Sequence, residues 1–421
     1  MRIVIVGAGI VGITTAYELA RDGHEVVVLE QRSAVAEEAS FANAGLLAPG
    51  LLRPWAAPGV FGPARWPLLG PKALVRIASG ASRADLQWLW RWRQTAQHNA
   101  RSLAQGALPP ALAALEELAR YSQARLRQTL EALQLDPEIQ RGGLVLLRTE
   151  QEHAALAPLA QLLRDAGLPL DWLDADAARR LEPGLSPHTP LAGALHLPEA
   201  EAGNCRLLAL MLRQAAQELG VRFIFNAQVA RLHHAPTGVQ LAGETAARHC
   251  DAVVLCAGMA SAALLRPLGL RLPLTALHGY TLSASLREEL HAPQGSVMDA
   301  ARQISIARLG LRIRVGGGAE LGGGSEERHE PTLARLYATL TDWFPGGAQL
   351  ADNVQVWRGI RAMPPDGLPV LGASGLTGLW LNLGHGDSGW ALASGGARLL
   401  ADLIAQREPE TAHEAFALQR F

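Results

Sequence analysis

Residues 2–30 read RIVIVGAGIVGITTAYELARDGHEVVVLE, and this stretch decides the fold. The apolar run before Gly7 has the length and the β-branched composition of a buried parallel strand. Gly7, Gly9 and Gly12 then form a G-x-G-x-x-G pattern, and the residues up to Ala20 predict a helix. A second strand ends in the acid Glu30. Strand, glycine turn, helix, strand and acid in this order are typical of dinucleotide binding.

Each residue of this pattern has a physical reason. Gly7 permits a tight turn, Gly9 lets the backbone approach a pyrophosphate, and Gly12 lets the helix pack closely on the strand. The start of the helix offers unpaired N–H groups and a positive dipole end to the phosphates. Glu30 follows Gly12 by eighteen residues and is placed to accept hydrogen bonds from both ribose hydroxyls. The pattern does not separate NAD from FAD, and a glycine-rich turn without a ligand is the alternative.

Length and composition limit the class of protein. A chain of 421 residues exceeds one typical core, so two domains are expected. Hydrophobic content of 49% and charged content of 18% fit a globular protein, and the net charge of −1 gives no overall attraction to nucleic acid. The cysteines Cys205, Cys250 and Cys256 lack metal-ligand spacing, so no metal site is expected. Their odd, sparse set argues against a disulfide scaffold and favours a reducing cytosol.

Membrane insertion is not expected from the sequence. Met1 and Arg2 lead directly into the first strand, which argues against a signal peptide. No stretch approaches the roughly 20 apolar residues that span a bilayer. Any membrane contact would therefore be peripheral.

Residues 53–101 have an unusual composition that suits such contact. They hold eight basic residues against the single acid Asp85, and five of the ten tryptophans of the chain. Indole rings and long cationic side chains suit the headgroup layer of an anionic membrane. The tryptophans of residues 88–92 do not fall on one helical face, which weakens this interpretation. Packing of these tryptophans between domains is the alternative.

A second glycine-rich turn, Gly384-His-Gly-Asp-Ser-Gly389, precedes a helix expected over residues 390–404. Ser388 is a plausible N-cap of that helix. The first helix already accounts for the pyrophosphate, so this open helix N-terminus needs another electron-rich partner. A reduced flavin carries negative charge at its N1/C2 carbonyl end, and the helix dipole would stabilise it. This feature favours FAD over NAD.

The cofactor domain is expected to be discontinuous. Residues 252–257 read as another buried parallel strand that meets a cofactor at Gly258, and residues 270–350 read as antiparallel strands. We therefore expect an α/β fold, α+β overall, with a Rossmann-like FAD-binding domain and an inserted substrate domain with a mainly antiparallel sheet. The expected ranges are 1–50, 200–268 and 352–421 for the FAD-binding domain, and 51–199 and 269–351 for the substrate domain.

Three residues are candidates for the chemistry. Arg361 ends a strand-like segment and can bind a substrate carboxylate through two hydrogen bonds, with a surface ion pair as the alternative. Tyr280 could cover the pocket or donate a hydrogen bond, or it could be a core tyrosine. His385, flanked by glycines, is interpreted mainly as a positioning residue and less as a base. Ser40 and Asn43 lie in the small-residue stretch 39–45, which suits close approach to a cofactor or a plain surface loop.

Several stretches together resemble the D-amino acid oxidase superfamily of flavoproteins, and most closely its bacterial D-amino acid dehydrogenases of the small-subunit, D-alanine dehydrogenase type. The resemblance runs along the whole chain and rests on residues 4–12, 40–45, 54–59, 278–280, 312–317, 358–367 and 379–386. It implies FAD, oxidation of a D-amino acid to an imino acid, and electron delivery to a membrane quinone. It also maps the carboxylate-binding arginine onto Arg361 and implies a peripheral place on the cytoplasmic face of the inner membrane.

The chain departs from the pattern of these relatives in two places. His278 and the pair Asp387-Ser388 stand where lysine and less polar residues are expected, which affects the expected substrate range. The covalent flavin link of the sarcosine oxidase relatives needs a cysteine in a region where none occurs, so noncovalent FAD is expected. An oxidase that uses oxygen, an enzyme for glycine, sarcosine or proline-type substrates, and a non-catalytic FAD-binding module are the alternatives.

These arguments give a candidate site. Arg361, Tyr280 and His385 are the expected catalytic residues. The residues expected to bind the cofactor are Gly7, Gly9, Ile10, Gly12, Glu30, Gln31, Arg32, Ser40, Asn43, Ala44, Gly45, Val229, Ala257, Gly258, Gly384, Gly386, Asp387, Ser388 and Gly389.

Overall fold

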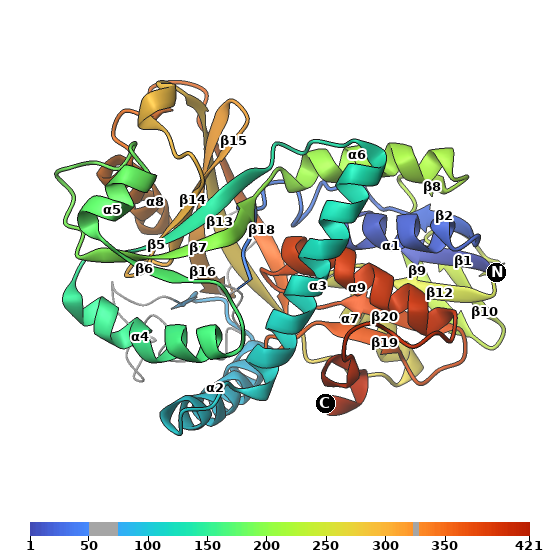
Figure 1. Ribbon diagram of the computed structural model, residues 1–421. Coiled ribbons are helices and arrows are strands. Elements are labelled where there is room, and N and C mark those ends of the chain that lie inside the picture. The colour runs from blue at the N-terminus through green and yellow to red at the C-terminus, as the bar shows by residue number, and fades with distance from the viewer. Residues whose placement is uncertain (50–74, 323–327) are drawn as a thin grey trace.

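The computed structural model describes residues 1–49, 75–322 and 328–421. Two large sheets divide the described chain, and Figure 1 shows them in separate halves of the molecule, with helix α3 (Pro110–Leu133) running along the boundary between them. The N-terminus lies at the far end of the half that contains β1. The expected α/β architecture is confirmed.

Within the described residues, the first sheet has six strands. Their order is β19 (Val370–Ala373), β20 (Leu379–Leu383), β12 (Ala252–Leu255), β1 (Arg2–Val6), β2 (Glu25–Leu29) and β8 (Arg222–Ile224). All neighbours are parallel except β19 and β20, which pair antiparallel. Strand β12 lies directly beside β1 although about 250 residues separate them, as the sequence predicts for a discontinuous cofactor domain.

Both faces of this sheet are covered by other elements. Successive side chains of β1 point to opposite faces, so its apolar residues contribute to two clusters. Ile3 and Ile5 pack against α1 (Ile10–Arg21), α6 (Cys205–Glu218) and α9 (Gly389–Ile404). Val4 and Val6 belong to a second apolar cluster with a small sheet of β9 (Val229–His234), β10 (Thr237–Leu241) and β11 (Arg248–His249). Helix α7 (Ala260–Leu265) follows β12.

The second sheet has eleven strands within the described residues. Its main path is β17 (Ala348–Gln349), β13 (Thr275–Leu286), β16 (Arg312–Leu321), β15 (Ile304–Leu309), β14 (Ser296–Asp299), β5 (Gln140–Leu147), β7 (Gly193–Ala202) and β3 (Leu46–Leu47). Three further strands pair beside this path: β18 (Gln355–Met363) with β13, β4 (Arg76–Ile77) with β16, and β6 (Asp171–Asp174) with β7. Most pairs are antiparallel, and β14–β5 and β16–β4 are parallel.

Four helices among the described residues complete this half. They are α2 (Arg83–Ala104), α4 (Glu150–Asp165), α5 (Ala175–Leu181) and α8 (Glu330–Trp343). Helix α8 corrects the expectation of strands throughout residues 270–350. Its buried residues Leu333, Leu336, Leu340 and Trp343 repeat every three or four positions, which is the apolar stripe of a helix that packs on a sheet.

Strand β18 bears on the expected domain ranges. It falls within 352–421, which the sequence assigns to the cofactor domain, but it pairs with β13 in the second sheet over nine residue pairs. The strand therefore carries the chain from the second sheet back to the first. The domain ranges remain a proposal.

The basic, tryptophan-rich segment 53–101 divides into an undescribed and a described part. Residues 50–74, with Arg53, Trp55, Arg65, Trp66 and Lys72, lie outside the described residues. In the described part, α2 begins at a capping box formed by Ser82 and Asp85. Trp88 and Trp92 are buried and stacked, whereas Trp90 is 62% exposed. Of the three tryptophans in residues 88–92, two therefore pack in the interior and one lies at the surface.

No helix within the described ranges is long and apolar enough to cross a bilayer.

Candidate active site

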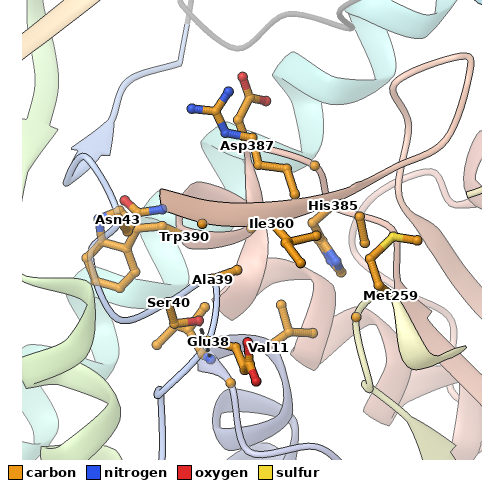
Figure 2. A pocket seen from close by; sticks show the side chains of 18 of the residues that line it. Val11, Glu38, Ala39, Ser40, Asn43, Met259, Ile360, His385, Asp387 and Trp390 are labelled. Atoms are coloured by element: carbon orange, nitrogen blue, oxygen red, sulfur yellow. Dashed lines mark hydrogen bonds between the residues drawn. The ribbon is translucent and has the colours of Figure 1, made fainter. Parts of the chain in front are cut away.

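A cavity of about 810 Å³ lies where the two sheets meet, in the upper part of the size range of ligand pockets. The first glycine turn, the loop after β2 and the second glycine turn form part of its wall. Residues of β9, β13 to β16, β18, β20 and α8, and of the segment 256–264 after β12, also line it. Figure 2 shows Ser40 and Asn43 from the first half of the chain and His385, Asp387 and Trp390 from its last part around one space.

Most of the expected site residues reach this cavity. Those that line it are Gly7, Gly9, Ile10, Glu30, Gln31, Arg32, Ser40, Asn43, Ala44, Val229, Ala257, Gly258, Arg361, Gly384, His385, Gly386, Asp387, Ser388 and Gly389. Gly12, Gly45 and Tyr280 are outside the lining.

The first glycine turn has the geometry that the sequence predicts. Gly7 has a φ of +104°, and a Cβ there would lie 2.6 Å from the carbonyl oxygen of Cys256 on the neighbouring strand. A Cβ on Gly12 would collide with the carbonyl oxygen of Gly7, so this glycine serves helix packing without touching the cavity. The backbone N–H of Ile10, at the start of α1, donates to the Ser40 hydroxyl at 3.1 Å. Both groups line the cavity at an open helix end.

Glu30 is fixed by the backbone before any ligand binds. Its Oε2 accepts from the N–H of Ala8 at 2.7 Å, and its Oε1 accepts from the N–H of Arg32 at 2.8 Å. Each carboxylate oxygen can accept a second hydrogen bond. The two backbone N–H groups therefore hold the carboxylate in place at the cavity. Each of its oxygens can still accept a hydrogen bond from a ribose hydroxyl.

The loop 39–45 is held by contacts to the second sheet and to α9. Asn43 Oδ1 accepts from the N–H of Gly45 at 2.8 Å, and the Asn43 carbonyl accepts from Arg314 Nη1 at 3.1 Å. Trp390 Nε1 donates to the Gly45 carbonyl at 3.0 Å. Gly45 thus supports the loop from outside the cavity, while Ser40, Asn43 and Ala44 face it.

The second glycine turn places the N-terminus of α9 at the cavity. Gly384 and Gly386 have φ angles of +73° and +57°, which favour glycine. The expected side-chain cap by Ser388 is wrong, because its hydroxyl donates to Asp387 Oδ1 at 3.3 Å and makes no cap hydrogen bond. The hydroxyl therefore does not occupy the first-turn N–H groups of α9.

His385 is a neutral imidazole in this turn. The side chain is 6% exposed, and burial lowers its pKa to about 4. Within the described residues, His385 Nε2 and Asn382 Oδ1 are buried and have no hydrogen-bond partner. Both residues line the cavity, so a ligand can satisfy polar atoms at this point. A neutral ring agrees with a positioning role.

Arg361 extends from β18 across Gly279 of the neighbouring strand. A Cβ on Gly279 would collide with the guanidinium, so this glycine makes room for the arginine. Arg361 Nη1 donates to the carbonyl of Gly318 at 3.1 Å. Burial lowers the pKa of the guanidinium, and the carboxylate of Asp387 opposes that shift. Arg361 remains a cation on the cavity wall, beside the second glycine turn.

Tyr280 does not take the expected position. Side chains alternate along β13, so Gly279 and Thr281 line the cavity while Tyr280 points away from it. Its ring is 1% exposed in the apolar cluster around Trp343. Its hydroxyl accepts from the N–H of His329 at 3.0 Å and donates to Glu320 at 3.4 Å. The alternative of a core tyrosine is the one the structure supports.

Several cavity residues were not found from the sequence. Asn382 and Trp357 lie on strands that the sequence predicts, but nothing in their neighbourhood separates them from core residues. Arg302 and Arg335 also line the cavity. Arg335 lies on α8. The apolar spacing of residues 333–343, which indicates this helix, is the signal that could have found it.

The residues present fit FAD. Two helix N-termini, those of α1 and α9, and the fixed carboxylate of Glu30 lie on one cavity wall. The cysteine on that wall, Cys256, is half-buried, and desolvation raises the pKa of its thiol to about 12. A thiol with this pKa is a poor nucleophile at neutral pH, which agrees with noncovalent binding. No group of three potential metal ligands occurs in the described parts of the chain.

Comparisons with known proteins identify the family of the chain. The family described as FAD dependent oxidoreductase matches residues 2–403. A D-amino acid dehydrogenase of Cereibacter sphaeroides is 40% identical over 426 residues, which cover 100% of this chain and 95% of that relative. A D-amino acid dehydrogenase of a Methylobacterium species is 39% identical and covers 100% of this chain and 99% of that relative.

Solved structures show the same fold. Glycine oxidase from Geobacillus kaustophilus has a TM-score of 0.76 at 24% identity, with 100% of this chain and 99% of that chain covered. L-proline dehydrogenase from P. horikoshii has a TM-score of 0.74 at 17% identity, with 100% and 97% covered.

Proposed function

Because the chain belongs to the FAD dependent oxidoreductase family and is an FAD-dependent enzyme, we propose that it oxidises D-amino acids of the D-alanine type. The observation that carries this proposal is the position of Arg361 on the cavity wall beside the glycine turn of His385 and Asp387. A guanidinium in this position can bind a substrate carboxylate through two parallel hydrogen bonds. The D-amino acid dehydrogenase names of the relatives support the choice of substrate.

The reaction is a hydride transfer from the α-carbon of the D-amino acid, and bound FAD supplies the two-electron acceptor. The imino acid product hydrolyses to a 2-oxo acid and ammonia. Arg361 holds the carboxylate, and so limits the orientations in which the α-carbon is presented. His385 stays neutral because of burial and positions the flavin side of the site through its unpartnered Nε2.

The cofactor would lie along the wall that the sequence predicts. The N-terminus of α1 would hold the pyrophosphate, and Glu30 would accept from the ribose hydroxyls. The N-terminus of α9 would stabilise negative charge on the reduced ring. The protonated thiol of Cys256 supports noncovalent binding.

The electrons are proposed to pass to a quinone-type acceptor at the cytoplasmic face of the inner membrane. The exposed face of α2 supports this part of the proposal. Leu86 and Trp90 are 52% and 62% exposed, and Arg83, Arg91 and Arg93 are exposed on the same helix. Apolar and aromatic side chains among arginines suit an anionic membrane surface. Figure 1 shows α2 at the edge of the molecule.

Anaerobic titration of the purified flavoprotein tests the function. D-Alanine should bleach the flavin absorbance and L-alanine should leave it unchanged. A flavin that neither D-amino acids nor glycine, sarcosine or proline can bleach would instead support a non-catalytic FAD-binding module. Reoxidation of the bleached enzyme then separates the acceptors, because a dehydrogenase is reoxidised by a soluble quinone analogue and slowly by oxygen. Rapid reoxidation by oxygen would identify an oxidase.

A further inference from the structure

Arg335 is a half-buried cation on the cavity wall that the proposed reaction does not use. It lies in the second turn of α8 and lines the same cavity as Arg361. Its guanidinium makes no hydrogen bond or ion pair with any residue in 1–49, 75–322 or 328–421. Burial lowers the pKa of Arg335, and the nearby positive charge of Arg302 lowers it further. A cation desolvated in this way gains most from an anionic partner.

The helix that carries Arg335 packs against the strand that anchors Arg361. A Cβ on Gly318, whose carbonyl accepts from Arg361, would lie 2.7 Å from the Thr332 methyl of α8. A Cβ on Gly317 would lie 3.3 Å from Leu336 of the same helix. Arg335 lies between Thr332 and Leu336 in sequence. The two glycines therefore let α8 pack directly behind the point where Arg361 is anchored.

Arg302 adds a second positive charge beside Arg335. Its Nη1 donates to the Thr339 hydroxyl at 3.1 Å, and Thr339 donates back to the carbonyl of Arg335 at 2.7 Å. The charge of Arg302 is offset by Asp342, whose carboxylate lies 2.8 Å from Nη2. The charge of Arg335 has no such partner in the described chain. The pair therefore leaves one positive charge available to the cavity.

The acids that line the cavity do not cancel this charge. Glu30, Glu37 and Glu38 belong to the first glycine turn and the loop after β2, at the dinucleotide end. Asp387 acts on Arg361, as its effect on the pKa of that guanidinium indicates. The residues of α8 and β16 that line the cavity therefore bring it a positive charge and no acid, and they line the same cavity as Arg361.

We propose that Arg335, supported by Arg302, is a specificity-determining residue that binds an acidic substrate side chain. This inference rests on the proposed D-amino acid oxidation and extends its substrate class beyond D-alanine to D-amino acids with a second carboxylate, such as D-glutamate and D-aspartate. Arg361 binds the α-carboxylate, and Arg335 binds the side-chain carboxylate.

D-Glutamate and its neutral isostere D-glutamine provide the test. The quantity to measure is the ratio of their kcat/KM values in the wild type and in Arg335→Gln. A lost hydrogen bond to a charged group corresponds to a decrease of that ratio by about 10- to 100-fold. Arg287→Gln is the matched control, because Arg287 is an exposed arginine of the same half that lies outside the cavity lining. An equal ratio in wild type and Arg335→Gln would overturn the inference.

A binding measurement separates failure of this inference from failure of the proposed function. Glutarate and butyrate differ in one carboxylate, and their binding to the flavoprotein can be followed by the change in flavin absorbance without turnover. Glutarate should bind more tightly than butyrate in the wild type, and Arg335→Gln should remove the difference. If D-alanine bleaches the flavin but Arg335→Gln leaves the affinity for glutarate unchanged, the proposed function stands. The assignment of Arg335 to a side-chain carboxylate is then wrong. If no D-amino acid bleaches the flavin, the glutarate result still decides whether Arg335 binds a second carboxylate.

Discussion

Trp88 Nε1 donates a hydrogen bond to the main-chain carbonyl of Met363 at 2.8 Å. This bond joins the second turn of α2 to the end of β18, two residues after Arg361. Trp88 and Trp92 also pack against Leu277 and Met363 in one apolar cluster. The helix that carries the exposed basic face is therefore attached to the strand that carries the candidate carboxylate ligand.

Substitution of tryptophans in α2 should separate interior packing from surface contact. Trp88→Ala should lower the free energy of unfolding by about 3–5 kcal/mol, because it removes a buried ring and its hydrogen bond. Trp90→Ala should change it by less than about 0.5 kcal/mol, because the ring is exposed. Trp90→Ala should nevertheless weaken cosedimentation with anionic vesicles. Denaturant unfolding and vesicle cosedimentation measure the two effects, and unchanged vesicle binding by Trp90→Ala would argue against membrane contact through this face.

Arg91 and Arg93 test the electrostatic part of the same contact. Each basic residue near an anionic membrane contributes about 1 kcal/mol, so the double change to Gln should weaken vesicle binding roughly 10- to 30-fold. Raised salt should reduce the difference, because it screens the attraction. Arg231→Gln combined with Arg266→Gln removes two exposed charges from the other half of the molecule and is the control. Equal losses in the two double variants would mean that α2 is not the docking face.

The flavin should be released by acid. Cys256 is the cysteine of the cavity wall, and its thiol, with a pKa raised to about 12, stays protonated. Precipitation of the purified protein with acid should leave yellow FAD in the supernatant. Flavin retained in the protein pellet would show a covalent link and contradict this prediction.

The buried imidazole of His385 should make stability depend on pH. Its pKa is about 4 in the folded protein against 6.5 for the free side chain, so the unfolded chain binds the proton first as pH falls. The folded state keeps its full stability above pH 6.5 and loses on the order of 2–3 kcal/mol from this group by pH 4.5. His385→Asn should therefore lose less stability than the wild type between pH 7.5 and 4.5. Urea unfolding at both pH values gives the comparison, and equal losses would show that the imidazole is not held neutral.

The sequence predicts the features that depend on local pattern and chain order. The glycine turns, the strands on both sides of the first turn and the return of the cofactor domain at residues 252–257 follow from apolar runs and glycine spacing. The packing role of Gly12 also agrees with the pattern, although this residue, expected among the cofactor-binding ones, lies outside the cavity lining. Their physical reasons lie within short stretches of the chain, so they can be read from the sequence.

The features that the sequence does not predict depend on which face of an element is covered. Tyr280 and Gly279 are neighbours, and only the pairing of β13 with β16 and β18 decides which of them faces the cavity. Ser388 does not cap α9 through its side chain, because its hydroxyl donates a hydrogen bond to the carboxylate of the preceding residue, Asp387. Trp88 and Trp92 are separated by one helical turn, but their burial becomes evident only when β18 is placed against α2.

Flavin reduction by D-alanine in the Arg361 variants tests the central claim most directly. Arg361→Ala should lower kcat/KM by about 30- to 1000-fold, because it removes a charge-assisted, bidentate contact worth roughly 2–4 kcal/mol. Arg361→Lys should restore only part of it, because one ammonium cannot reproduce the guanidinium fork. Wild-type enzyme should discriminate against D-alaninamide, which lacks the carboxylate, and Arg361→Ala should lose most of that discrimination. Near-normal kcat/KM in Arg361→Ala, or a wild type that prefers the amide, would contradict the account.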